Sequence, residues 1–370
     1  MPEPQLYCEV RTEGGVFRDW LQVTIAQSFD EAWQRNFSMI CAEPNQGLNQ
    51  RLVPGARVDI ALAGELVIKE GYIVNRQASY DPNRHAVKVD GYSKAGLATE
   101  GSVSSGTGQY RGYTVEAIAN DVLKTHGIKF RIEGNPDGAK LPFPNVMVRM
   151  GETPFAMIAR LCNQRGLRIW ADVDGTIVAG VKEAKGNATL VEGQNIIAAS
   201  CAISMPAVSE TIYNSQQPGS DSLFGKKAAE IQAKSKLTAG VPGIVRKGLA
   251  EMPLDQQGAV ARTNMDAQQI EASRLRVNVT YQGWEAPGLN RLWSLQDSVT
   301  VKSPMLFPTE SGSMDLKLWG YIYTQDTNGG TTTQIECVNR NAFAVRSPDG
   351  NVDDGWYRPG ATPAVPEAAT

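Results

Sequence analysis

The chain has 370 residues, of which 42% are hydrophobic and 20% are charged, and its formal net charge is −3. At roughly 150 residues per domain this length predicts two or three domains, and the composition argues against a disordered or fibrous chain. The slight negative charge argues against a protein that coats duplex DNA. The amino terminus lacks a signal-peptide pattern, and no apolar run approaches the ~18 residues that span a membrane. We therefore expect a chain made and kept in the cytoplasm.

Strand-like stretches fill the first hundred residues. At 57–63 the apolar residues Val58, Ile60 and Leu62 occur at every second position, which is the period of a strand with one buried face. Several such strands at close spacing predict a small β-barrel or sandwich over residues 1–100, and a polar linker follows at 99–109. The six stretches are residues 6–11, 20–26, 37–41, 57–63, 65–75 and 85–91.

Two predicted helices with matching start and end residues follow the linker. The first is predicted over 114–127, with Thr114 as N-cap and Gly127 at its end. The second is predicted over 153–166, with Thr153 as N-cap and Pro154 at the first helical position. Because a strand-like triplet follows each helix, we expect an α+β helix-strand module over residues 110–184. The first helix should bury one face, made of Val115, Ile118, Ala119, Val122 and Leu123.

Strand-like sequence returns after about residue 185. We expect a second β-barrel over 185–345, interrupted by a helical and basic insertion at about 221–275 that includes a helix at 264–275. The basic part, 221–248, is either a contact for nucleic acid or an acidic protein, or a solvated insertion, and we favour the solvated insertion. Its cations are Lys226, Lys227, Lys234, Lys236, Arg246 and Lys247. Residues 346–370 are expected to form a flexible tail.

A short phrase occurs near both ends of the chain. Gly-Tyr-Ile ends a strand-like run in each case, and a polar turn and another alternating run follow it. This shared order predicts that the two barrels are related, although chance similarity of two hairpins is the alternative. The landmark residues of the repeated hairpin are Gly71, Tyr72, Ile73, Gly320, Tyr321 and Ile322.

The five cysteines lie far apart and form no CxxC pair. This spacing argues against a zinc knuckle, a redox pair and a disulfide framework. Most have apolar neighbours, where a free cysteine behaves as a small hydrophobic residue, so we predict structural roles. They are Cys8, Cys41, Cys162, Cys201 and Cys337.

The sequence offers no catalytic constellation. Walker A, HExxH, GxSxG and GxGxxG patterns are absent. His126 comes at the end of a helix, where a cation favours the helix dipole, and His85 begins a strand, so structural or surface roles are expected for both. We therefore predict that the chain is not an enzyme, and we assign no catalytic, cofactor or metal residues and no cofactor.

Carboxylates give no better candidate. Asp172 and Asp174 belong to the stretch DVDG, which is the usual chemistry of a hairpin turn, and Asp353 with Asp354 falls in the tail. An acid pair drawn from distant parts of the fold would make the chain a cell-wall hydrolase, which is one alternative. Another is a peptidoglycan-binding module, because residues 151–169 resemble the start of LysM modules; here a strand and hairpin follow in place of the second LysM helix.

Three stretches taken in order resemble the baseplate hub proteins of contractile-tailed phages. The likeness is to Mu-like phages in particular, to P2-like tail hubs, and to the amino-terminal part of type VI secretion spike proteins. The stretches are YTVEAIANDVLKTHGIKF (113–130), GETPFAMIARLCNQRGLRIWADVDGTIV (151–178), and LNRLWSLQDSVTVKSPMLFP (289–308) with LWGYIYTQD (318–326).

The resemblance implies a structural role in the phage tail. A homotrimer with two similar barrels per chain would present six similar surfaces, and such a ring would join the sixfold tail tube to the threefold central spike and let DNA pass. The implied partners are other copies of the chain, the spike protein, the tube or tube-initiator protein, the tape-measure protein and other baseplate proteins. The implied location is the tail baseplate of the virion, with exposed strand edges as natural contact sites.

Overall fold

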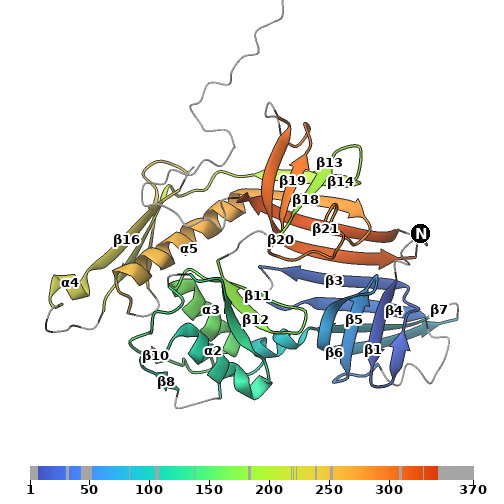
Figure 1. Cartoon of the computed structure of the whole chain (residues 1–370), viewed down its shortest axis with the longest axis horizontal. Coiled ribbons are helices and arrows are strands. Elements are labelled where there is room, and N and C mark those ends of the chain that lie inside the picture. Colours follow the sequence, from blue (N-terminus) through green and yellow to red (C-terminus); the bar gives the residue numbers. More distant parts are fainter. Residues whose placement is uncertain are drawn as a thin grey trace, which may run out of the picture.

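A computed structural model describes residues 7–340 except 31–32, 43–51, 83, 105–107, 137, 182–184, 218, 220, 222, 238–239, 251–252, 308–310 and 328. The tail expected at 346–370 therefore lies outside the described residues. Strands dominate the structure, which confirms the expected mainly β class with an α+β middle. Figure 1 shows a long sheet, a helical module below it, and an arm that projects to one side. The arm is formed by the strands and the short helix between residues 210 and 249.

The strands of the first half follow the expected stretches closely. In β3, Val23 and Ile25 are buried on one face while Thr24 and Ala26 are less covered, which is the period-two pattern of a half-buried strand. Their order in the sheet is β2, β1, β5, β6, β7, β4, β3. The bounds are β1 (Cys8–Thr12), β2 (Gly15–Phe17), β3 (Gln22–Ser28), β4 (Asn36–Ala42), β5 (Arg57–Leu62), β6 (Glu65–Asp81) and β7 (Arg84–Tyr92).

The second half repeats this strand order. Strands β13, β19, β20, β21, β18 and β14 are neighbours in that sequence, as are β1, β5, β6, β7, β4 and β3 in the first half. The one difference in direction is that β13 runs parallel to β19, whereas β1 runs antiparallel to β5. The bounds are β13 (Asn187–Val191), β14 (Ala198–Ile203), β18 (Leu275–Gln282), β19 (Ser298–Lys302), β20 (Ser313–Asp326) and β21 (Gly330–Asn339).

The two halves are joined edge to edge. Strand β3, the last strand of the first half, pairs antiparallel with β20 from Gly320↔Ser28 to Asp326↔Gln22. One hydrophobic cluster runs through both halves, so they share a core. Among the described residues, the ladders form one open path from β14 to β2 and close no separate ring of strands around either half.

The Gly-Tyr-Ile phrase does not mark equivalent positions. Strand β6 has a bulge between Ile73 and Asn75, and β20 has one between Leu318 and Gly320. When the two bulges are aligned, the hairpin ends Asp81 and Asp326 also align, and Gly320 becomes the equivalent of Asn75. Gly71 therefore lies four residues away from the position equivalent to Gly320. The halves are alike in strand order and bulge, and the repeated phrase is out of register.

Each glycine of the phrase has its own packing reason. A Cβ on Gly71 would lie 2.7 Å from Ile68 Cγ2 and 3.1 Å from the Tyr92 carbonyl oxygen. A Cβ on Gly320 would lie 2.7 Å from Ser28 Cβ, at the start of the β3–β20 ladder. Both positions need the close backbone approach that only glycine allows.

The middle module forms around the two predicted helices. Thr114 Oγ1 accepts from Ala117 N at 3.3 Å and Thr153 Oγ1 from Ala156 N at 3.1 Å, so both predicted N-caps are confirmed. The predicted apolar face of the first helix is buried in full. A three-stranded sheet packs beside the helices in the order β11, β12, β9. The elements are η1 (Lys94–Thr99), β8 (Gln109–Tyr110), α2 (Val115–Leu123), η2 (Lys124–His126), β9 (Phe130–Glu133), β10 (Val146–Met147), α3 (Pro154–Gln164), β11 (Arg168–Ala171) and β12 (Ile177–Gly180).

The basic stretch belongs to a small sheet in the arm. Strand β15 (Glu210–Ser215) lies between β16 (Ile231–Lys236) and β17 (Val245–Leu249), and the short helix α4 covers Lys226–Ala229. In β16, Ile231 and Ala233 pack against Ala259 while Lys234 and Lys236 are exposed. These two lysine side chains are thus exposed, and the backbone of this stretch is ordered into strands (Figure 1).

The long helix α5 (Gln256–Arg274) connects the arm to the main sheet (Figure 1). It begins eight residues before the predicted start at 264. Asp255 is its N-cap, with Oδ1 accepting from Gly258 N at 2.8 Å. The polar first turns of α5 lack a clear apolar period, which is why the sequence pattern missed them. The helix buries its small and polar residues against β15, β16 and α3.

Candidate functional site

The residues considered for chemistry in the sequence lie apart from one another. His85 is exposed beside the Tyr80 ring, at 5.9 Å between ring centroids, and the His126 imidazole contacts Thr125 Oγ1 at 3.1 Å. Within the described ranges, no three His, Cys, Asp or Glu side chains cluster as metal ligands. None of the helices in those ranges is long and apolar enough to cross a membrane.

Asp172 and Asp174 work as turn and ion-pair residues. Asp174 accepts hydrogen bonds from Thr176 N and Thr176 Oγ1, both at 2.9 Å, and Asp172 forms an ion pair with Arg131. Burial raises the pKa of Asp174, but the Thr176 hydrogen bonds lower it further, so its pKa lies below the ordinary value. The group is therefore an ionised turn residue, and Asp353 and Asp354 lie outside the described residues.

All five cysteines are free thiols. Cys8, Cys41, Cys162 and Cys337 are buried, and burial raises the pKa of Cys8 to about 12. A thiol with a raised pKa is a poor nucleophile at neutral pH. The predicted structural role holds for these four. Cys201 is half-buried on β14, the strand at one end of the sheet.

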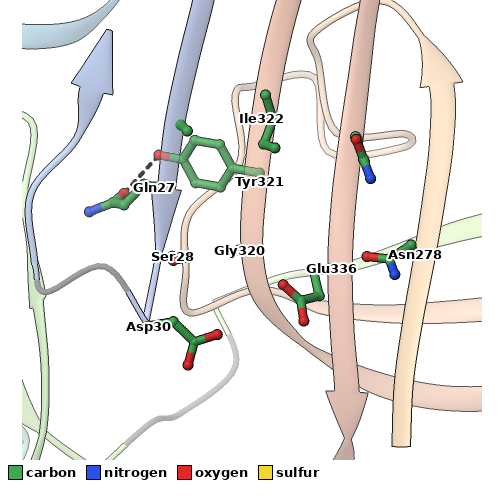
Figure 2. A pocket seen from close by; sticks show the side chains of 10 residues that line it. Gln27, Ser28, Asp30, Asn278, Gly320, Tyr321, Ile322 and Glu336 are labelled. Atoms are coloured by element: carbon green, nitrogen blue, oxygen red, sulfur yellow. Dashed lines mark hydrogen bonds between the residues drawn. The ribbon is translucent and has the colours of Figure 1, made fainter. Parts of the chain in front are cut away.

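The antiparallel β3–β20 ladder, called the joint below, connects the two halves, and a shallow depression lies over it. Figure 2 shows it bounded by β3, β20, β21 and β18, with Asp30 and Glu336 as its acidic groups. Arg276 Nη1 lies 3.6 Å from Asp30 Oδ2 and also pairs with Glu336, and Trp319 Nε1 donates to Asp30 at 2.6 Å. Both carboxylates are thus held as ion-pair partners. The depression offers a contact surface with both polar and apolar groups.

A buried polar network underlies this depression. Tyr321 Oη donates to Gln27 Oε1 at 2.8 Å and accepts from Arg35 Nε at 3.2 Å. Gln27 Nε2 in turn donates to the Ala171 carbonyl at 3.1 Å, on β11 of the middle module. Gln27 is 2% exposed and Arg35 6%. Tyr321 therefore connects the second half to Gln27 and Arg35 of the first half, as its bond to Gln27 in Figure 2 shows, and Gln27 connects the first half to the middle module.

The equivalent surface of the first half carries similar groups. Asp90 pairs with Asn75 and Ser38 in the ladders of β7, just as Glu336 pairs with Gly320 and Asn278 in those of β21. Asp90 Oδ1 lies 3.0 Å from Lys88 Nζ, and Asn75 Nδ2 donates to Asp90 Oδ2 at 3.3 Å. An acidic group with a neighbouring amide or hydroxyl thus recurs in both halves.

Several strand edges are left without a partner in the described chain, among them the outer edges of β2, β13 and β14 and one side of β6. Strand β14 pairs only with β18, and residues 75–80 of β6 pair only with β7. Apolar side chains are exposed beside both edges: Ile203 is 45% and Ile197 61% exposed near β14, and Tyr80 is 86% exposed on β6. These edges are surfaces on which another chain can pair, because an unpaired strand edge is a template for another chain.

Sequence reasoning expected strand edges as contact sites without identifying them. Strand β14 itself lies within the strand-like sequence predicted after about residue 185. Its exposed outer edge depends on which strand sits at the end of the sheet, and no local pattern carries that information. A usable signal was present: AASCAI (198–203) contains no charged residue and no proline, although edge strands are usually protected by them.

Two family descriptions match the first half of the chain in consecutive order. Residues 7–93 match the "Mu phage baseplate assembly protein GpP-like, N-terminal" family. Residues 95–181 match "Baseplate hub protein gp44-like, second domain". The boundary between the two matches falls where β7 ends and η1 begins. A curated relative, "Baseplate hub protein gp44" of Escherichia phage Mu, is 25% identical over 189 residues. That alignment covers 51% of this chain and 49% of the relative, so it spans about half the length of each.

Solved structures share the fold over nearly the whole chain. The 43 kDa tail protein of prophage MuSo2 from Shewanella oneidensis has a TM-score of 0.77 and 22% identity, with 91% of this chain and 99% of that chain covered. The E. coli c3393 protein has a TM-score of 0.54 and 11% identity, with 89% and 76% covered. Its description names it a component of the type VI secretion system with structural similarity to T4 tail proteins gp27 and gp5.

Proposed function

We propose that this chain, whose consecutive residues 7–93 and 95–181 match domains of baseplate assembly and baseplate hub proteins, is the hub of a phage tail baseplate and works as a homotrimeric ring. Its work is assembly and passage, with no bond made or broken. The ring would join the sixfold tail tube to the threefold central spike and leave a channel for DNA. As such, the protein would be part of the virion tail, after assembly in the host cytoplasm.

The observation that carries this proposal is the common strand order of the two halves. Six strands occur in the same neighbour order in each half, with a bulge at the same place in β6 and β20. Three copies would therefore present six similar sheet units around one axis. Such a ring is a natural adapter between parts with sixfold and threefold symmetry.

The surface groups support the same interpretation. Asp90 with Ser38, and Glu336 with Asn278, occupy equivalent ladder positions in the two halves. A partner with sixfold symmetry would thus meet an acidic group with a hydrogen-bonding neighbour at each of six places. We propose the tail tube or its initiator as that partner, and the spike protein as the threefold one. Further partners would be the tape-measure protein and other baseplate proteins.

Electron microscopy of the purified chain mixed with its neighbouring spike protein tests this function. We expect rings with threefold symmetry and six similar lobes, with the spike seated on one side. Particles that stay single and show no ring when the spike is present would contradict the hub function. Peptidoglycan pelleting would then test the LysM-like alternative, and cell-wall clearing the hydrolase alternative.

A further inference from the structure

We propose that β14 of one copy pairs antiparallel with residues 75–81 of β6 in the next copy, in the register of the β3–β20 joint inside each chain. This inference rests on the proposed ring, which it extends to a defined contact. The chain holds one complete joint between its halves and also both parts of a second joint, at β14 and at residues 75–81 of β6. In the proposed ring another copy completes this second joint.

The inner joint gives the template. In β20, residues before the bulge pair with β19, and residues from Gly320 onward pair with β3. Strand β6 is built in the same way: residues up to Tyr72 pair with β5, and residues after the bulge have β7 on one side only. The open side of β6 from Asn75 onward thus corresponds to the side of β20 that β3 occupies.

The strand that should fill this place is β14, the equivalent of β3. Ala26 of β3 pairs with Asn36 of β4, which pairs with Tyr92 of β7. In the second half, Ala202 of β14 pairs with Arg276 of β18, which pairs with Val338 of β21. Tyr92 and Val338 both lie two residues beyond the equivalent acids Asp90 and Glu336. Ala202 is therefore the counterpart of Ala26.

This equivalence fixes the register of the joint. Within the chain, Ile25 pairs with Tyr323. The counterpart of Ile25 is Cys201, and the counterpart of Tyr323 is Ala78. The joint between copies should therefore place Cys201 opposite Ala78. The neighbouring pairs on the same face follow as Ile203 opposite Arg76 and Ala199 opposite Tyr80.

Backbone directions agree with this register. Ser204 N donates to the Arg274 carbonyl at 2.8 Å, so the Ser204 amide points toward β18. Because N–H groups alternate in direction along a strand, the amides of Ile203 and Cys201 point away from β18, to the open side. In the inner joint, Phe29 N donates to the Trp319 carbonyl at 3.1 Å, so the equivalent odd-numbered amides of β3 point to β20. The free amides of β14 thus have the phase that β3 uses.

The side chains at the two edges suit a second copy of this chain. Strand β14 carries small residues and no charge, so a neighbouring strand can approach closely. Arg76 and Asp81 are the charged residues among residues 75–81, and in the proposed register they lie opposite the uncharged Ile203 and Ala198. Ile203 and Tyr80, which are 45% and 86% exposed, would be covered. An uncharged edge of this length is a liability unless another chain covers it.

The joint is head-to-tail, because each copy contributes β14 on one side and β6 on the other. Contacts of this kind build closed rings or open filaments. Alternation of the inner joint with an equivalent outer joint would relate all the halves by similar rotations. Three chains would then close with six similar joints, three within chains and three between them.

A single substitution tests the register. Ala78→Cys would place a thiol opposite the native Cys201, in a hydrogen-bonded pair whose Cα atoms are about 5.5 Å apart. That separation suits a disulfide, whose Cα–Cα distance is about 4.4–6.8 Å. After treatment with diamide, we expect the main species on a non-reducing gel to be three linked chains, near three times 40.0 kDa. A reducing agent should return it to single chains.

Two matched variants serve as controls. Gln77→Cys puts its thiol on the opposite face of β6 and should give less than a tenth of the cross-linking. Ala78→Cys combined with Cys201→Ser should give none, since the other four native cysteines are buried. Cross-linking that is equal in the Gln77→Cys and Ala78→Cys variants, or that persists without Cys201, would overturn the register.

The native mass of the unmodified protein distinguishes a failure of the β14–β6 joint from a failure of the ring itself. If that mass is trimeric but the Ala78→Cys variant does not cross-link, the β14–β6 joint is wrong and the ring stands. If the mass is monomeric at every concentration and with spike protein added, the ring itself is wrong. Trimeric mass together with cross-linking through Cys201 supports both.

Discussion

Tyr321→Phe should weaken the joint between the two halves without changing the shape of the core. The lost hydroxyl donates to Gln27 Oε1 at 2.8 Å and accepts from Arg35 Nε at 3.2 Å, and both partners are almost fully buried. A buried group left without its partner costs roughly 1–3 kcal/mol, and more when it is charged. We therefore expect the free energy of unfolding to fall by about 3 kcal/mol.

Urea unfolding followed by tryptophan fluorescence measures this loss. With a slope of about 3 kcal/mol per molar urea, the midpoint should fall by about 1 M. Tyr113→Phe is the matched control: Tyr113 is 51% exposed, so its change should stay within about 0.5 kcal/mol. If Tyr321→Phe costs no more than Tyr113→Phe, the network does not hold the joint and the reasoning fails.

Three further changes test other parts of the structure by the same unfolding measurement. Thr153→Ala removes the N-cap of α3 and should cost about 1 kcal/mol; an unchanged midpoint would count against the cap. Gly320→Val should cost about 1–3 kcal/mol or more, because its Cβ would lie 2.7 Å from Ser28 Cβ, and a neutral result would refute the close approach. Burial raises the pKa of Glu152, but hydrogen bonds from Arg160 at 2.8 and 2.9 Å and from Arg149 N lower it further, so the folded pKa lies below its ordinary value. Its contribution to stability is therefore present above the unfolded pKa of about 4.3 and is lost as the pH falls through the folded pKa. The loss of stability on acidification should be smaller in Glu152→Gln, and an identical pH profile would refute the role of the pair.

Local patterns predicted the elements that are specified by neighbouring residues. Thr114 and Thr153 are the N-caps that the sequence indicated, and the predicted apolar face of α2 is the buried one. The strands predicted at 57–63 and 85–91 match β5 and β7 within a residue or two. Caps, turns and period-two runs act over a few residues, so a single sequence contains the information needed to find them.

Features set by distant pairing were not predictable in this way. The β3–β20 joint pairs residues about three hundred positions apart, and nothing near Gln22 or Asp326 indicates the other. The repeated Gly-Tyr-Ile phrase predicts that the two halves are related. Their equivalence is instead defined by the bulges, which make Asn75 the counterpart of Gly320. The free edge of β14 likewise follows from its place at the end of the sheet.

Light scattering of the purified protein over a wide range of concentrations tests the central claim most directly. A hub that forms a closed ring predicts a native mass near three times the 40.0 kDa of the chain. Intermediate species should not accumulate as the concentration is raised. A mass of one chain at every concentration, unchanged when the neighbouring spike protein is added, would contradict the ring and the hub function that depends on it.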